Sequence, residues 1–141
     1  MDEENLVEEP VTEDPEPTPE PVSVTDSILG SIRKALGGEL FPNPSDESPF
    51  DEDLKMHINS ALFILTQIGV GTAGFTITGY EETWNDFLGE NNKNMELVKT
   101  DVYKRVRLMF DPPVSSVLVG IIKDEIREYE WRLQERAEFN V

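Results

Sequence analysis

Residues 95–113 read MELVKTDVYKRVRLMFDPP, and this stretch decides the fold class of the chain. Apolar side chains recur in it at the period of one face of an α-helix, at Met95, Val98, Val102, Val106 and Met109. Leu97 and Leu108 fall on the other side, so the helix has two apolar faces. Asp111-Pro112-Pro113 then ends it, because proline cannot continue a helix. We predict a helix from about residue 94 to 110 that packs on two sides.

The last predicted helix runs from about Pro113 to near Ala137, with Asp111 as its cap. Its apolar stripe consists of Val114, Leu118, Ile121, Ile122, Ile126, Tyr129 and Leu133. Glu128 and Arg132 stand four residues apart in the orientation that favours an ion pair. Trp131 lies on the far side from the stripe. It indicates either a second contact surface or an aromatic ring lying across the stems of its neighbours.

Helical signals also occur upstream. Thr25-Asp26 can cap a first short helix, which Gly37-Gly38 ends. Ser48-Pro49 begins a second helix that runs to about Ile68. The apolar stripe of the second helix is formed by Leu54, Ile58, Ala61, Leu62 and Leu65, while Phe63 and Ile64 extend beyond it and predict cover on more than one side. Residues 83–89 predict one or two helical turns with Trp84, Phe87 and Leu88 pointing inward.

Residues 69–74 read GVGTAG and match the letters of the G-x-G-x-x-G dinucleotide fingerprint. That motif binds a pyrophosphate only where it follows a strand and opens a helix. Here it follows a predicted helix, and residues 75–78 alternate like a short strand. We therefore interpret it as a helix end and a turn.

Together these elements predict an all-α fold, a small bundle of about four to five helices that allows a short β segment near 75–78. Residues 1–25 carry nine acidic side chains, no basic one and five of the ten prolines. Such a stretch buries too little apolar area to offset its ordering entropy, so we expect an acidic, Pro-rich, disordered arm. The predicted organisation is the arm at 1–25 and one helical domain at 26–141.

Composition excludes several classes of function. The chain has no cysteine, which rules out disulfides, cysteine-ligated zinc and thiol catalysis. The formal net charge is −17, and both the arm and the domain are acidic, so neither should grip a phosphate backbone unaided. No apolar run is long enough to span a bilayer, and the acidic start Met1-Asp2-Glu3-Glu4 differs from a signal peptide. We expect a soluble protein that is not secreted and has no membrane partner.

No pattern of catalytic chemistry emerges from the residues. His57 is the only histidine and has no second histidine or cysteine with which to hold zinc, so we expect a structural role for it. Asp51, Glu52 and Asp53 fall in the first turn of a predicted helix, where the helix dipole favours negative charge. They lack the glycine and spacing of a calcium loop. The sequence predicts no enzyme activity, no metal and no cofactor.

A further pattern is formed by the order and spacing of residues 56–61, 67–71, 74–77, 84–89, 98–113 and 130–133. In this pattern the chain resembles the head–tail connector family of tailed bacteriophages, and the likeness covers roughly residues 26–141. It implies a mostly α-helical, non-enzymatic adaptor that docks on the portal protein as a ring, usually of twelve copies. The ring would extend the DNA channel, which the genome passes without sequence-specific binding. It would also present a platform for a tail-side stopper or tail-completion protein, at the head–tail junction of a virion assembled in the host cytoplasm.

The same resemblance suggests that the last helix makes the portal contact, and we select Arg127, Trp131, Arg132 and Arg136 as candidates because arginine and tryptophan are enriched at binding hot spots. The loop 70–83 is a second candidate, as a channel or neighbour contact, through Val70, Thr72, Phe75 and Thr76. The alternative from a different class is an acidic, DNA-mimic-like regulatory module that binds a basic partner. Salt would weaken that complex sharply.

Overall fold

The computed structural model describes residues 23, 26–37 and 48–139, apart from the side chains of the last two. In this part of the chain there are five helices and no strand: α1 (Ile28–Leu36), α2 (Asp51–Gln67), α3 (Trp84–Leu88), α4 (Met95–Phe110) and α5 (Ser116–Phe139). The all-α prediction is therefore confirmed. The arm predicted at 1–25 lies outside the described residues, apart from Ser23.

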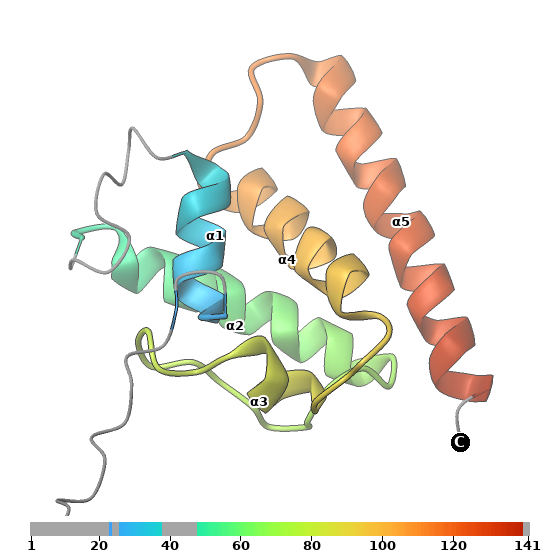
Figure 1. The fold of residues 1–141 in the computed structure, drawn as a ribbon. Coiled ribbons are helices and arrows are strands. Elements are labelled where there is room, and N and C mark those ends of the chain that lie inside the picture. The colour runs from blue at the N-terminus through green and yellow to red at the C-terminus, as the bar shows by residue number, and fades with distance from the viewer. Residues whose placement is uncertain (1–22, 24–25, 38–47, 140–141) are drawn as a thin grey trace, which may run out of the picture.

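Helix α4 is the centre of the fold and contacts each of the other four helices. In Figure 1 it lies between α2 and α5, with α1 crossing one end of the α2–α4 pair and α3 below it. Val98, Val102 and Val106 of α4 are fully buried against the predicted stripe of α2. Burying a side chain of this kind stabilises the fold by about 1.5–3 kcal/mol, which explains why the two stripes meet.

Helices α1 and α3 are joined to each other through their starting residues. Ser27 caps α1, because its hydroxyl accepts a hydrogen bond from the Gly30 amide at 3.0 Å. The expectation that Thr25 or Asp26 caps this helix is thus corrected; Thr25 lies outside the described residues. Ser27 also forms a β-bridge with Thr83, whose hydroxyl caps α3 in a reciprocal capping box with Asp86. Trp84 is buried and its indole N–H donates to Ser31 at 2.9 Å.

The short β segment allowed near residues 75–78 does not form. An asparagine side chain of α2 supplies the hydrogen bonds that a neighbouring strand would otherwise provide. Asn59 accepts from the Ile77 amide at 2.8 Å and donates to the Ile77 carbonyl at 3.1 Å. These two hydrogen bonds hold Ile77 in the core, where its side chain is 2% exposed. The alternating pattern at 75–78 therefore belongs to a loop fixed to α2 and not to a strand.

The glycines of residues 69–74 end α2 and turn the chain, as the sequence indicated. Gly69, Gly71 and Gly74 have φ values of 92°, 81° and 81°, in the region that favours glycine. The Val70 amide donates to the Leu65 carbonyl at 2.9 Å, which closes the helix. No strand precedes this turn and no helix follows it directly, so the context of the dinucleotide motif is missing from the described chain.

Two helices start later than the sequence suggested. Helix α2 begins at Asp51, and Ser48 forms a turn before it in which the Ser48 amide donates to the Asp51 carboxylate at 3.1 Å. Helix α5 begins at Ser116 instead of Pro113, and the Ser115 hydroxyl, not Asp111, accepts from an amide of its first turn at 3.3 Å. The consecutive prolines leave residues 111–115 as a linker. α5 therefore stands apart from the end of α4 at this side of the molecule (Figure 1).

Candidate interaction surface

Helix α5 is anchored by its second half. Leu133 is fully buried, and Ile126 and Ile122 are 8% and 9% exposed. All three belong to the stripe predicted for this helix, and α4 is the helix on which α5 chiefly packs. The stripe is thus confirmed as the inward face over this half of the helix.

Ion pairs between α4 and α5 reinforce this anchor. Arg105 of α4 donates to Asp101 at 2.8 Å and to Glu130 of α5 at 2.5 Å, while Lys104 reaches Glu125 at 2.8 Å. The Asp101 carboxylate is completely buried, and this desolvation raises its pKa although the hydrogen bond from Arg105 opposes the rise. Burial also opposes ionisation of Arg105, but its bonds to Glu130 and Asp101 hold the pKa above the ordinary value. Arg105 thus has two roles: it neutralises the buried carboxylate of Asp101, and it attaches α5 to α4 through Glu130.

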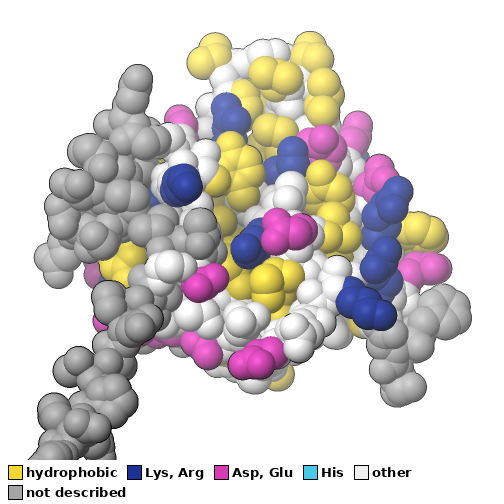
Figure 2. Space-filling view, viewed as in Figure 1, with side chains coloured by type: hydrophobic (Ala, Val, Ile, Leu, Met, Phe, Trp, Pro, Cys, Tyr) yellow, Lys and Arg dark blue, Asp and Glu magenta, His cyan; other side chains and the backbone are white. Residues whose placement is uncertain are grey.

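The first half of α5 and the linker before it expose apolar side chains to solvent. Val114 is 104% exposed, Val117 is 70% exposed, and about half of Leu118 and Ile121 is exposed. Figure 2 shows hydrophobic side chains across this end of the molecule. The stripe predicted for the whole helix is therefore uncovered at Val114, Leu118 and Ile121, because α4 has already ended beneath them. We call Val114, Val117, Leu118 and Ile121 the apolar end of α5.

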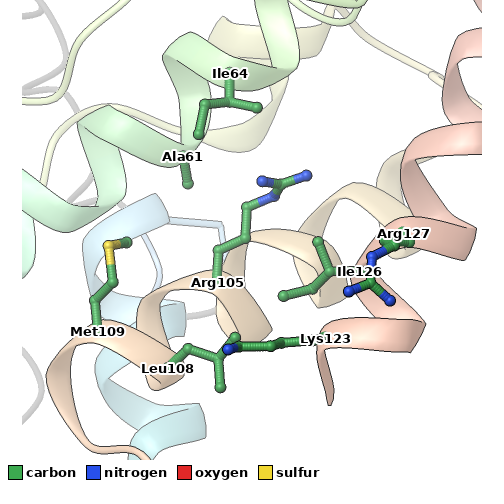
Figure 3. Close-up of a pocket in the computed structure, with 8 residues that line it drawn as sticks. All are labelled: Ala61, Ile64, Arg105, Leu108, Met109, Lys123, Ile126 and Arg127. Carbon is green, nitrogen blue, oxygen red and sulfur yellow. The ribbon is translucent and has the colours of Figure 1, made fainter. Parts of the chain in front are cut away.

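A groove lies where α2, α4 and α5 meet, with a volume of about 330 Å³. Figure 3 shows its lining residues, which come from all three helices: Ala61 and Ile64 from α2, Arg105, Leu108 and Met109 from α4, and Lys123, Ile126 and Arg127 from α5. The floor is apolar and the polar lining residues are all basic. Met109 and Ile64 are partly exposed here. Nothing in the linear pattern of any one helix pointed to this groove, since it depends on how three of them converge.

The four residues selected for a portal contact occupy two faces of α5. Arg127 and Trp131 are four residues apart and share the outward face, where Trp131 is 62% exposed. Arg132 and Arg136 share a second face, about 100° further round the helix. Arg132 pairs with Glu128 at 2.7 Å, as the spacing predicted, and Arg136 donates to Asn94 at 2.8 Å. Figure 2 shows basic side chains gathered over this half of α5.

The loop candidates are not equally available for contact. Val70 is buried in the core, and Phe75 is half-buried with its ring 5.3 Å from that of Phe87. Thr72 donates through its amide and its hydroxyl to the Phe87 carbonyl, at 3.0 and 3.1 Å. Thr76 is exposed. The loop is therefore fixed to α3, and Thr72 and Thr76 are the two of the four that reach the surface.

The acidic first turn of α2 has structural partners. Asp51 lies 3.5 Å from the buried Arg33 and accepts a hydrogen bond from the Tyr80 hydroxyl at 3.3 Å, while Glu52 pairs with Lys55 at 2.7 Å. No group of three or more histidine, cysteine or acidic side chains in the described residues could hold a metal ion. None of the described helices is long and apolar enough to cross a membrane.

A small helical domain with an apolar helix end, a groove and an exposed tryptophan has the surface of an assembly subunit. Comparison with known families agrees with this class. The model of the phage connector protein family matches residues 28–140, which is most of the chain, and the chain belongs to that family. Membership confirms the resemblance found in the sequence and gives the protein a connector-type structural role in a phage. No curated protein and no solved structure matches the chain.

Proposed function

We propose that this protein is the adaptor subunit of a head–tail connector ring, which docks on the portal protein, extends the DNA channel and carries a tail-side stopper or tail-completion protein. The role is structural and not enzymatic, and its place is the head–tail junction of the virion. The observation that carries the proposal is the apolar end of α5, four aliphatic side chains that the subunit itself leaves uncovered. Exposed aliphatic surface of this kind is costly in water and marks a protein–protein contact.

The subunit has two different candidate contact faces, and this favours assembly into a ring over a simple dimer. The apolar end of α5 and the outward face with Arg127 and Trp131 lie on the two halves of one helix. A cyclic ring needs two different contact faces on each subunit, one for each neighbour, and the portal requires a further surface. Acidic side chains facing the channel would repel DNA and let the genome slide past.

We assign the portal contact to the outward face around Trp131. Substituting Trp131→Ala removes a side chain that is 62% exposed, so the subunit should stay folded while portal docking weakens. Co-sedimentation with purified portal rings measures docking, and thermal unfolding of the free subunit checks the fold. Phe63→Ala on α2 is the matched control, because it removes another exposed aromatic ring, at 60% exposure, from a different helix. Docking that Trp131→Ala leaves unchanged would remove this assignment.

Two further observations would separate the adaptor from the acidic regulatory module. A phage with an early stop codon in this gene should give complete tails and unattached heads by electron microscopy, whereas normal virions would contradict an adaptor role. The complex with the portal should also tolerate salt, because its contacts are partly apolar. A one-to-one complex with a basic protein that dissociates as salt rises would instead identify the regulatory module.

A further inference from the structure

The polar side chains that line the groove between α2, α4 and α5 are all basic, whereas the chain as a whole is acidic. The chain has 29 acidic side chains and 12 basic ones, but the groove is lined by three basic residues and no acidic one. Arg105 is already held by Asp101 and Glu130, and Arg127 by Asp124 at 2.5 Å. Lys123 forms no ion pair with an acid in the described part of the chain. Figure 3 shows Lys123 and Arg127 both projecting from α5 beside the apolar floor.

The dimensions and chemistry of the groove fit a short peptide segment better than a cofactor. Its volume of about 330 Å³ is at the lower limit of small-molecule sites. Ile64, Leu108, Met109 and Ile126 offer aliphatic and thioether contacts. A complementary ligand would therefore present one or two aliphatic side chains flanked by carboxylates.

Residues 3–9 of the same chain, Glu-Glu-Asn-Leu-Val-Glu-Glu, have this pattern. Leu6 and Val7 are adjacent aliphatic residues in an acidic and proline-rich arm, and the segment has two glutamates on each side of this pair. Sixteen residues lie between Glu9 and Asp26, and this stretch can span up to about 55 Å when extended. That length exceeds the diameter of a domain of this size, so the segment can reach the groove from the start of α1.

We propose that residues 3–9 dock in this groove within the same subunit. Leu6 and Val7 occupy the apolar floor, and the flanking glutamates face Lys123. The segment thereby covers apolar surface that the folded helices leave open, and it gives the acidic arm a binding site on its own domain. The inference does not depend on ring assembly or on the portal.

A spin-label experiment on the full chain tests this docking directly. The chain has no cysteine, so Pro10→Cys creates a single labelling site beside the segment. Met109 lines the groove, whereas Met95 lies fourteen residues away on the same helix, a distance of about 21 Å. With methyl-labelled methionine, the spin label should broaden the Met109 resonance strongly and the Met95 resonance much less.

Three variants complete the test. Leu6→Ser with Val7→Ser should abolish the excess broadening of Met109, and Lys123→Glu should reduce it. Lys93→Glu is the control, because it makes the same change of charge at an exposed position outside the groove lining. Unchanged Met95 chemical shifts would show that each variant is folded.

Equal broadening of Met109 and Met95, or excess broadening that survives the Leu6 and Val7 substitutions, would overturn the proposal. A mixed sample provides a separate check, with the spin label on one set of chains and the labelled methionines on another. Broadening of Met109 in that sample would assign the segment to a neighbouring copy and overturn docking within the subunit.

Discussion

Arg105 joins a fully buried carboxylate of α4 to the second half of α5. Because Asp101 has no exposure and Arg105 binds it at 2.8 Å, removing the guanidinium leaves a buried charge unpaired. We expect Arg105→Ala to lower the free energy of unfolding by about 3–5 kcal/mol in urea titrations. Lys104→Ala is the control, since its partner Glu125 is partly exposed and such a pair contributes about 0–1 kcal/mol. Similar losses in the two variants would contradict a special role for Arg105.

Glu82 makes the free energy of unfolding decrease as the pH becomes acidic. Partial burial disfavours its charged form, but hydrogen bonds from the Thr78 hydroxyl and amide and from the Gly79 amide lower its pKa below the ordinary value of a glutamate. A carboxyl whose folded pKa is depressed stabilises the fold above the unfolded pKa, and this contribution is lost as pH falls through the folded pKa. Glu82→Gln should therefore reduce the acid sensitivity of unfolding below about pH 4.5.

The comparison for Glu82 is Glu81→Gln, which changes the neighbouring exposed acid and removes the same formal charge. Thermal unfolding followed from neutral to acidic pH measures both variants. If both lose acid sensitivity equally, net charge and not the Thr78 hydrogen bonds accounts for the effect.

At the scale of elements, the turn after α2 offers a matched pair of glycines. Gly71 and Gly74 share a φ of 81°, but a Cβ on Gly71 would run into the Phe87 ring whereas one on Gly74 would meet open space. Gly74→Ala should cost about 1–2 kcal/mol from the left-handed backbone alone. Gly71→Ala should cost clearly more, since α3 must shift away from the turn. Equal losses of stability in the two variants would show that the Phe87 ring can move away from an added Cβ at no cost.

Elements set by local sequence patterns could be predicted from the sequence, whereas features set by contacts between distant residues could not. The stripes of α2 and α4 are local periodic patterns. The stripe of α2 is buried as expected, and that of α4 is buried at Val98, Val102 and Val106, whereas Met109 near its end is 48% exposed. The sequence predicts that the last helix begins at Pro113, three residues before α5 does, because it does not show whether Pro112-Pro113 opens a helix or continues a linker. The alternation at 75–78 predicts a strand, but no strand forms there. Asn59, eighteen residues earlier, makes the hydrogen bonds to Ile77 that a neighbouring strand would make, and the local pattern does not show this contact. The groove likewise arises from three helices whose convergence no single pattern contains.

The whole molecule shows an imbalance between the two halves of α5. The second half is held by Leu133, Ile126 and the Arg105 ion pairs, whereas the first half projects beyond the end of α4 with aliphatic side chains in water. A free subunit gains little from these exposed residues, yet an assembly can bury them at about 25 cal/mol per Å². Stability of the subunit and capacity to assemble should therefore depend on different residues of one helix.

Substitutions on the two halves test this separation. Val117→Asp with Ile121→Asp should leave the unfolding of the free subunit nearly unchanged, because surface substitutions usually alter stability by less than about 0.5 kcal/mol each. The same variant should fail to support connector assembly, measured as attached tails in a complementation assay, because it places charge in an apolar contact. Leu133→Ala should behave in the opposite sense, with a loss of about 2–5 kcal/mol in stability from a cavity at a fully buried site. If Val117→Asp with Ile121→Asp assembles normally, the apolar end of α5 is not the contact that holds the connector together.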